Sequence, residues 1–363
     1  MPVKREMMVR KDALEQTAIN ETIAPEPKDG EVLLEIEAFA LTANNVTYAV
    51  VGELVKYWYF FPAPEGWGIV PVWGHARVSA SRHPDIAAGE RVYGYLPTAT
   101  HLIVAPGKVS AGQFRDMTAH RQPMAAVYNL YRRLAADPAH DPAREEARML
   151  FEPLFLTSFL LDDQLRRQDW HGAGSVILTS ASSKTAMGLA HVARASSPGI
   201  RRIGLTSGSN VAFVEQTGLY DQVIAYDALD ALDVAGTAVL VDFAGNAGVI
   251  ADVQARLAER LVHILKVGVT HHDEGVAGGG DSGVATGPKP VWFFAPDAAA
   301  TLIGAIGQDG FQSAVAERWH AFLTDADGWV TVDRQSGAEA IQRVWRDQVA
   351  GRAKPDIGYI MRW

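Results

Sequence analysis

Cysteine is absent from this chain of 363 residues. Its absence excludes disulfides, thiolate zinc sites and cysteine nucleophiles, and it fits a reducing compartment. The sequence also has no apolar run of about 18 residues, the length that a membrane-spanning helix requires. The first residues, Met1 to Glu6, lack the apolar core of a signal peptide. We therefore expect a cytoplasmic protein with no membrane partner.

Basic clusters are absent from the sequence as well. The net charge is −9, and the Lys and Arg residues form no run or stripe, which argues against nucleic acid as the main partner. The rest of the composition is typical of a globular enzyme, with 48% hydrophobic and 21% charged residues. The length is sufficient for two domains of ordinary size.

The first third of the chain is predicted to be rich in β-strands. Its short segments of alternating or apolar residues, broken by Gly and Pro, are typical of a compact barrel-like domain. The strand candidates are 31–40, 74–80, 89–96 and 101–105.

The middle third alternates between strand and helix patterns. This alternation predicts βαβ units and therefore a parallel sheet. The strand candidates are 176–179, 203–206, 222–226, 238–242 and 262–268, and the helix candidates are 154–168, 185–195, 211–217 and 249–257. Further along we expect a buried strand at 291–294, helices at 311–323 and 338–349, and a final strand at 357–361.

The segment from Ser175 to Arg194 is the most informative one. It predicts a buried strand, a tight polar turn and a helix, which together present backbone N–H groups to an anion, usually a phosphate. A dinucleotide-binding turn normally has glycines at this point. This turn instead contains Ser180, Ser182, Ser183 and Lys184.

Several short motifs, in their order along the chain, resemble those of the medium-chain dehydrogenase/reductase superfamily. They are Gly30-Glu31-Val32-Leu33-Leu34-Glu35-Ile36, Gly89-Glu90-Arg91-Val92, Leu156-Thr157-Ser158 and Ala353-Lys354-Pro355-Asp356-Ile357-Gly358-Tyr359-Ile360. Because the chain has no cysteine ligands for zinc, it is similar to the zinc-free branch of quinone and enoyl reductases. Its departures at the cofactor turn suggest a divergent subfamily, of the kind classed as a domain of unknown function.

This resemblance implies a fold and a division into domains. The fold class is α/β, with a GroES-like β-barrel domain, a Rossmann-type domain with a parallel sheet, and the active site in the cleft between them. The barrel domain is expected at 1–136, the Rossmann-type domain at 137–323 and a return to the barrel domain at 324–363, with a linker at 137–142.

The resemblance also implies a cofactor site. In an alignment with the family's glycine-rich turn, the residues expected to hold a pyrophosphate are Ser180, Ser182, Ser183, Lys184 and Thr185. Their hydroxyls, backbone N–H groups and the Lys184 charge suit that role, although serines that merely cap the helix are the alternative interpretation. The run Ser183-Lys184-Thr185 is also similar to the Gly-Lys-Thr end of a P-loop motif, but the glycines that a P-loop needs are missing.

The end of the next strand indicates which dinucleotide is bound. An NAD site places an Asp or Glu there to hold the ribose hydroxyls, whereas this chain has Thr206, Ser207 and Asn210. These residues tolerate a 2′-phosphate, so we expect NADPH rather than NADH, although small polar residues are also common in ordinary turns. Tyr226 fits either an adenine contact or the core. The other expected cofactor contacts are Thr157, Phe243, Ala244, Gly245 and Val267.

The candidate catalytic residues lie in the first domain. Asn45 falls near the position of the family's polar residue, and Tyr57 and Tyr59 are candidate proton donors. The aromatic run from Tyr57 to Phe61 indicates a bulky apolar substrate pocket, although such runs also fill cores.

Histidines are the remaining candidates for chemistry. His75 follows a glycine, but zinc needs several convergent ligands and none lies nearby in the sequence. We therefore expect His75 to be structural and expect no metal. His271 and His272 follow a strand end, where acid–base, metal-binding and solvated roles compete; we expect them to be solvated or structural.

The expected function is that of a metal-free, NADPH-dependent oxidoreductase that transfers hydride to an activated C=C or C=O. Its partner would be a bulky apolar small molecule, and the family resemblance favours a homodimer. Two alternatives stay open. The glycine-free turn favours a reductase-like scaffold or regulatory protein that has lost its cofactor. The same cleft would also suit proton transfer in a lyase or hydratase.

Overall fold

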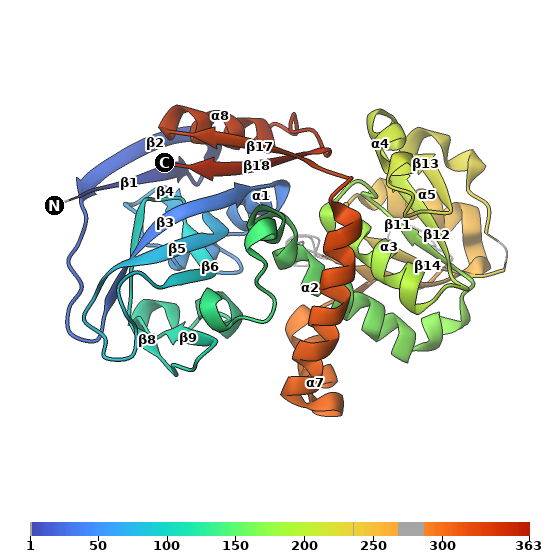
Figure 1. Cartoon of the computed structure of the whole chain (residues 1–363). Helices are drawn as coiled ribbons and strands as arrows, with labels where there is room; N and C mark the ends of the chain where they lie inside the picture. Colours follow the sequence, from blue (N-terminus) through green and yellow to red (C-terminus); the bar gives the residue numbers. More distant parts are fainter. Residues whose placement is uncertain (1, 235, 268–286) are drawn as a thin grey trace. The chain divides into compact units, whose positions relative to one another are not determined.

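The computed structural model describes residues 2–234, 236–267 and 287–363. The chain divides into two compact units (Figure 1): unit 1 consists of Met1–Leu150 and Thr331–Trp363, and unit 2 of Phe151–Val330. The first boundary lies inside helix α2, Glu145–Arg167. The sequence-based boundaries after residues 136 and 323 remain a prediction.

Unit 1 is built mainly from two β-sheets. The smaller sheet has the strand order β2-β1-β4, and the larger has the order β17-β18-β3-β5-β6-β10-β9-β8 with β7 also paired to β3. Among the described strands neither path returns to its start, so the β-rich domain that the sequence predicts is present without a closed barrel. The bounds are β1 Val3–Arg10, β2 Ala13–Ile23, β3 Val32–Leu41, α1 Ala43–Val50, β4 Trp67–Ile69, β5 Pro71–Ser81, β6 Arg91–Pro97, β7 His101–Val104, β8 Pro106–Gly107, β9 Gln113–Asp116, β10 Leu130–Arg133, β17 Thr331–Ser336, α8 Ala338–Val349 and β18 Ile357–Arg362.

The core of unit 1 combines side chains from both of its chain segments. Helix α8 contributes Ile341 and Trp345, which are fully buried together with Phe39 of β3 and Tyr131 of β10. The Trp345 Nε1–H donates to the Leu14 carbonyl at 2.7 Å. The segment after residue 330 is therefore an integral part of this unit.

Unit 2 contains a parallel sheet with the strand order β13-β12-β11-β14-β15-β16. Its central strands are continuous apolar runs, as expected for strands that are covered on both faces; in β11, Val176, Ile177 and Leu178 have no exposed surface. The bounds are β11 Ser175–Leu178, α3 Lys184–Ser196, β12 Arg201–Thr206, α4 Val211–Gln216, β13 Gln222–Ala225, β14 Ala238–Asp242, α5 Ala247–Leu257, β15 Leu261–Lys266, β16 Val291–Trp292 and α7 Ala295–Ala326.

Two predictions differ from the structure near the end of unit 2. The predicted buried strand at 291–294 contains only the two residues of β16, and Val291 and Phe294 are about half exposed. The predicted helix at 311–323 is part of the longer α7, which changes direction at Gly307, a glycine with a φ of 76°. The expectation of a buried strand was wrong because only Phe293 in that run faces the core.

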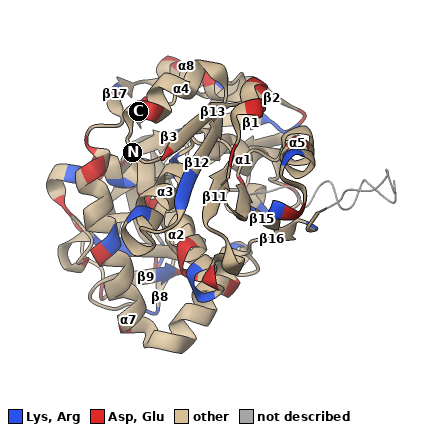
Figure 2. Cartoon of the chain, turned by 90° about the vertical axis from the view of Figure 1, so that its right-hand side faces the viewer, with Lys and Arg blue, Asp and Glu red and all other residues tan. Residues whose placement is uncertain are grey.

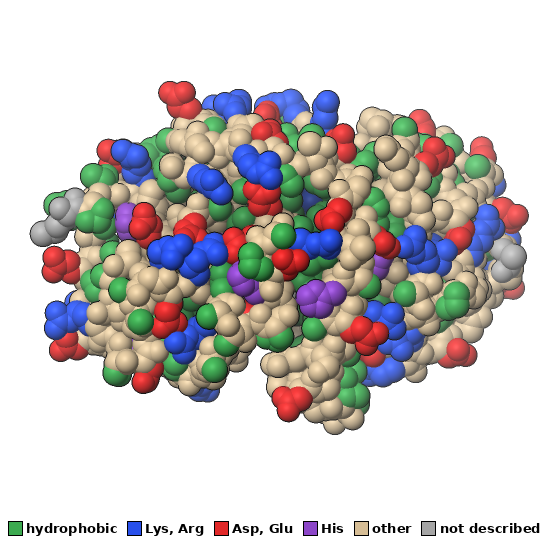
Figure 3. All heavy atoms as spheres, viewed as in Figure 1, with side chains coloured by type: hydrophobic (Ala, Val, Ile, Leu, Met, Phe, Trp, Pro, Cys, Tyr) green, Lys and Arg blue, Asp and Glu red, His purple; other side chains and the backbone are tan. Residues whose placement is uncertain are grey.

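The surface carries charges of both signs. Along the ribbon in Figure 2 and on the face shown in Figure 3, basic and acidic residues are intermixed rather than gathered by sign. No helix of the described part of the chain combines the length and the apolar character needed to cross a bilayer.

Candidate cofactor and active site

In the sheet of unit 2, the direction in which the chain adds strands reverses between β11 and β14. The chain runs outward in opposite directions from β11 and β14, which are neighbours in the sheet. In open parallel sheets, ligands bind outside the carboxyl ends of the strands at such a reversal point. The residues that follow β11 and β14 are therefore the first candidates for a binding site.

The turn after β11 has an unusual backbone. Ser180 adopts a φ of 46°, which lies in the left-handed region that favours glycine. The turn is closed by a hydrogen bond from the Ser183 N–H to the Ser180 carbonyl at 2.7 Å. The Ser180 N–H donates to the hydroxyl of Tyr226 at 2.7 Å. Ser180 thus provides, without glycine, the backbone conformation for which glycine is the usual residue.

Helix α3 begins directly after this turn. Ser183 is its N-cap, and the Ser183 hydroxyl accepts a hydrogen bond from the Ala186 N–H at 3.2 Å. Since a helix leaves its first four N–H groups without partners inside the helix, this cap satisfies only one of them. Thr185 lies in the same first turn, and the Lys184 ammonium lies 5.9 Å from the centre of the Phe151 ring. The helix start can therefore accept an anion.

Two glycines outside the turn allow its close packing. A Cβ on Gly204 of β12 would lie 2.9 Å from the Cβ of Ala181, and one on Gly188 of α3 would lie 2.6 Å from the Ser158 hydroxyl. That hydroxyl donates to the Thr185 carbonyl at 2.7 Å and so ties α2 to the start of α3. The close approach of helix and strand, which a glycine normally permits in a dinucleotide fold, is therefore provided at positions that the sequence analysis did not select.

The residues after β12 contact the same turn. The Asn210 side-chain amide donates to the Ser182 hydroxyl at 3.1 Å, so the two neighbouring turns are joined. Ser207 lies beside Ser209, with 3.2 Å between their hydroxyl oxygens, and Thr206 is buried. The structure thus brings together most of the residues that the sequence analysis proposed for the phosphate and the ribose.

A buried pair that the sequence analysis missed shapes the turn after β14. The Thr179 hydroxyl donates to the Asp242 carboxylate at 2.7 Å, and both side chains are fully buried. The same hydroxyl accepts hydrogen bonds from the N–H groups of Phe243 and Ala244, at 2.8 and 3.1 Å. The Asp242 carboxylate also accepts from the Gly245 N–H at 3.1 Å. Their positions at two adjacent strand ends are the only sequence signal that would have suggested this pair.

The other proposed cofactor contacts are partly exposed. The Val267 N–H donates to the Asp242 carbonyl at 2.8 Å, which keeps Val267 at the same sheet edge. Thr157 lies on α2 and is half-buried. His271 and His272 lie outside the described residues. Among the described residues, no group of three or more potential ligands could hold a metal ion.

The three proposed catalytic residues occupy different environments in unit 1. Asn45 is buried at the start of α1, where its amide oxygen accepts from the Thr42 N–H at 2.7 Å and its amide nitrogen donates to the Pro71 carbonyl at 2.9 Å. Tyr59 is half exposed and donates to Glu53 at 2.8 Å. Asn45 thus caps a helix, and Tyr59 lies at the surface.

Tyr57 differs from both because it belongs to an aromatic cluster. Its hydroxyl lies 2.9 Å from that of Tyr128, and its ring centre lies 4.6 Å from that of Tyr48. Burial raises the pKa of Tyr57 above its usual value, so the phenol keeps its proton at neutral pH. Tyr128 was not selected from the sequence, since no local pattern connects it with a residue 71 positions away.

Changing Ser180 to Gly is expected to stabilise the protein by up to about 1 kcal/mol, because a non-glycine residue in the left-handed region carries a steric cost. Chemical denaturation of Ser180→Gly and of the wild type measures the difference. Ser182→Gly is the matched control, since Ser182 has no positive φ and its hydroxyl accepts a hydrogen bond from the Asn210 side-chain amide. That control should lose stability, and equal losses in both variants would contradict the backbone argument.

Comparisons with known proteins agree with the fold. The family model described as "Protein of unknown function (DUF2855)" matches residues 39–354. No curated protein matches the chain. A structure of CurA in complex with NADPH from Vibrio vulnificus is similar with a TM-score of 0.61 and 14% identity, and the match covers 98% of both chains.

Two further solved structures are similar over 99% of both chains. One is the yhdH oxidoreductase from Salmonella enterica in complex with NADP, with a TM-score of 0.54 and 12% identity. The other is the quinone oxidoreductase from Coxiella burnetii, with a TM-score of 0.51 and 12% identity. At these identities the similarity establishes the fold alone, and it confirms the predicted α/β fold class, with a parallel-sheet domain and a β-rich domain.

Proposed function

The chain belongs to the DUF2855 family, and we propose that it is an NADPH-dependent oxidoreductase that reduces an activated C=C or C=O of a bulky apolar substrate without a metal. The observation that carries this proposal is the turn from Ser180 to Ser183, whose left-handed first residue leads into the start of α3 at the reversal point of the sheet. Similar folds are found in proteins whose structures were determined with NADPH or NADP. The absence of cysteine supports the metal-free part of the proposal.

The turn and the following strand end would hold the cofactor. The first-turn N–H groups of α3 and the charge of Lys184 suit a pyrophosphate. The polar segment after β12, with Ser207 and Asn210, has no carboxylate that would repel a 2′-phosphate, which favours NADPH over NADH. When bound, NADPH supplies the hydride.

The remaining chemical requirement is a proton. Tyr57 is our candidate donor, because its hydroxyl is hydrogen-bonded to that of Tyr128 and the pair is largely shielded from water. The tyrosine pair can pass a proton between its two hydroxyls while a carbonyl oxygen or carbanion carbon accepts one. The apolar rings around Tyr57, including Tyr48 and Phe60, favour a bulky apolar substrate.

NADPH binding by the Lys184→Ala variant tests the cofactor site. We expect calorimetry to show that the wild type binds NADPH and that Lys184→Ala binds it about ten-fold more weakly, since a charge-assisted phosphate contact is lost. Lys289→Ala is the control, because Lys289 is an exposed lysine of the same unit and should leave the affinity unchanged. An affinity equal to that of the wild type in Lys184→Ala would favour a simple helix cap.

A cofactor-free scaffold is the second candidate, and one observation favours it. The Ser180 N–H is already engaged by Tyr226, so the turn is partly satisfied without a ligand. Because a ligand that binds only the folded state must raise the melting temperature, an unchanged Tm with both NADPH and NADH would support the scaffold. Turnover without consumption of NADPH would instead support a lyase or hydratase.

A further inference from the structure

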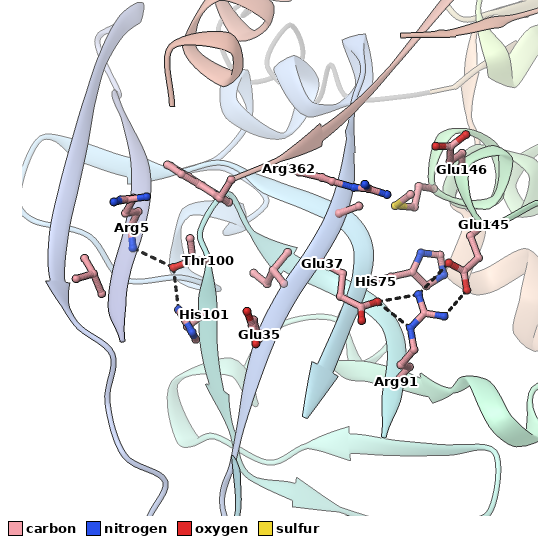
Figure 4. Close-up of a pocket in the computed structure, with 15 residues that line it drawn as sticks. Arg5, Glu35, Glu37, His75, Arg91, Thr100, His101, Glu145, Glu146 and Arg362 are labelled. Atoms are coloured by element: carbon pink, nitrogen blue, oxygen red, sulfur yellow. Dashed lines mark hydrogen bonds and ion pairs between the residues drawn. The ribbon is translucent and has the colours of Figure 1, made fainter. Parts of the chain in front are cut away.

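Unit 1 contains a pocket of about 550 Å³ beside strand β3 (Figure 4). Strand β5 pairs with nearly the whole length of β3 along one edge. The two other strands that pair with β3, which are β7 and β18, therefore share its opposite edge. On that edge β7 pairs with Val32–Glu35 and β18 with Phe39–Leu41. Residues 36–38 lie between these partners, and the pairing with β5 shifts register there. The pocket therefore lies where neither short strand covers β3.

Most carboxylates around this pocket are already paired with arginines. Glu37 and Glu145 both accept hydrogen bonds from Arg91, at 2.8 Å for Glu37 and at 2.6 and 2.9 Å for Glu145. Although burial opposes it, the hydrogen bonds from Arg91 and His140 lower the pKa of Glu145 to about 2, so this carboxylate stays ionised. Glu146 accepts two bonds from Arg334, each of 2.6 Å. These carboxylates are therefore not available to attract a cationic ligand.

Three donor side chains around the pocket, in contrast, have no partner in the described part of the chain. His75 is 1% exposed, and neither of its ring nitrogens has a hydrogen-bond partner in the described part of the chain. The buried Nε1–H of Trp363 also has none there. The Arg362 guanidinium forms no hydrogen bond or ion pair with the described residues. Figure 4 shows the Arg362 side chain extending from β18 toward the end of the pocket with His75 and Arg91.

Buried polar groups without partners are rare and costly in folded proteins. Burial lowers the pKa of His75 to about 3, so its ring is neutral and carries one N–H donor and one acceptor nitrogen. The imidazole N–H of His75 and the indole N–H of Trp363 are the buried groups without partners, whereas Arg362 is exposed and its guanidinium is solvated by water. Together the three groups fit an acceptor that carries a single negative charge, because Arg362 is the only charged group among them and the ring of His75 is neutral.

We propose that this pocket is a second ligand site, separate from the cofactor turn, and that it binds a small monocarboxylate with an apolar body. Arg362 holds the carboxylate with its forked N–H groups, and the N–H of His75 or Trp363 completes the contact. Ile36, Ala38 and Met149 line the same pocket and receive the apolar body. Glu35, the remaining acidic lining residue, is exposed next to His101 at the other end, where solvent screens its charge.

Calorimetric titration with hexanoate, and separately with hexanamide, tests this proposal in the full-length protein. The two probes have the same apolar chain and differ in the charge of the head group. We expect hexanoate to bind and hexanamide to bind at least about ten-fold more weakly, which corresponds to one charge-assisted contact. Equal binding of the two probes, or no heat from hexanoate at about 10 mM, would overturn the proposal.

Two variants separate this site from non-specific binding. Arg362→Gln is expected to weaken hexanoate binding about ten-fold, whereas Arg352→Gln should leave it unchanged, because Arg352 is an exposed arginine paired with Asp347. His75→Phe keeps a ring in place and should also weaken binding. Full binding in both pocket variants refutes the site. Because NADPH titration reports on the other unit, failure here and failure of the proposed function are distinguishable.

Discussion

Replacing Asp116 by Ala is expected to lower the free energy of unfolding by about 3–5 kcal/mol. Asp116 and Arg121 are both fully buried in unit 1, with 2.8 Å between Arg121 Nη1 and the carboxylate. The other carboxylate oxygen accepts from the N–H groups of Ala105 and Thr118. Removal of the carboxylate leaves a buried guanidinium without its counter-charge, which is the costly case for an ion pair. Urea denaturation followed by circular dichroism measures the loss.

Asp12→Ala provides the matched control for this effect. Asp12 also accepts two hydrogen bonds from an arginine, Arg10, at 2.9 and 2.7 Å, but the pair lies at the surface. Because exposed ion pairs contribute little, this variant should lose less than about 1 kcal/mol. Similar losses in Asp116→Ala and Asp12→Ala would contradict the view that burial makes the inner pair important.

Replacing Tyr57 by Phe is expected to lower the turnover number for NADPH-dependent reduction of the probe 1,4-naphthoquinone by about 100-fold, the usual contribution of a positioned proton donor. NADPH affinity should stay unchanged, since Tyr57 is not among the proposed cofactor contacts. Steady-state kinetics and calorimetry measure the two quantities. Tyr59→Phe is the matched control, because Tyr59 is half exposed and its hydroxyl donates to Glu53. Equal losses in the two variants would exclude Tyr57 as the donor.

The same proposal predicts the pH dependence of the wild-type rate. Burial raises the pKa of Tyr57 above its usual value of 10.0. The protonated form is the active one, and it persists at every pH below that raised pKa. The rate should therefore stay level between about pH 7 and 9 and fall only at higher pH. A decline that is centred below pH 9 would indicate another proton donor.

The strands and helices of unit 2 could be predicted closely from the sequence. The apolar run at Val176–Leu178 and the polar turn after it predict β11 and the start of α3 because a strand buried on both faces is a continuous apolar run. In unit 1 the sequence analysis did not predict the antiparallel pair of β1 and β2. Strand β2, Ala13–Ile23, is partly exposed along its length and has no apolar alternation. It is held instead by distant contacts, such as the Gln342 amide donating to Thr17 at 2.9 Å.

The candidate site was predictable in its location but not in its internal contacts. The position of the turn at Ser180 follows from the strand–turn–helix pattern, whereas its left-handed φ does not follow from the residue type. The bond between Thr179 and Asp242 joins residues 63 positions apart. No local pattern reports such a pair, because its partners meet only when β11 and β14 lie side by side.

Strand β18 has a consequence for the order in which the protein is made. It lies between β17 and β3 in the larger sheet of unit 1, whose strands other than β17 and β18 precede unit 2 in the chain. During translation all of unit 2 emerges from the ribosome before β17, α8 and β18 do. The buried side chains of Ile341 and Trp345 are therefore missing from unit 1 until the segment after unit 2 has been made. Unit 2 is thus inserted into the sequence of unit 1, and its whole sequence is made before the strands that complete the larger sheet of unit 1.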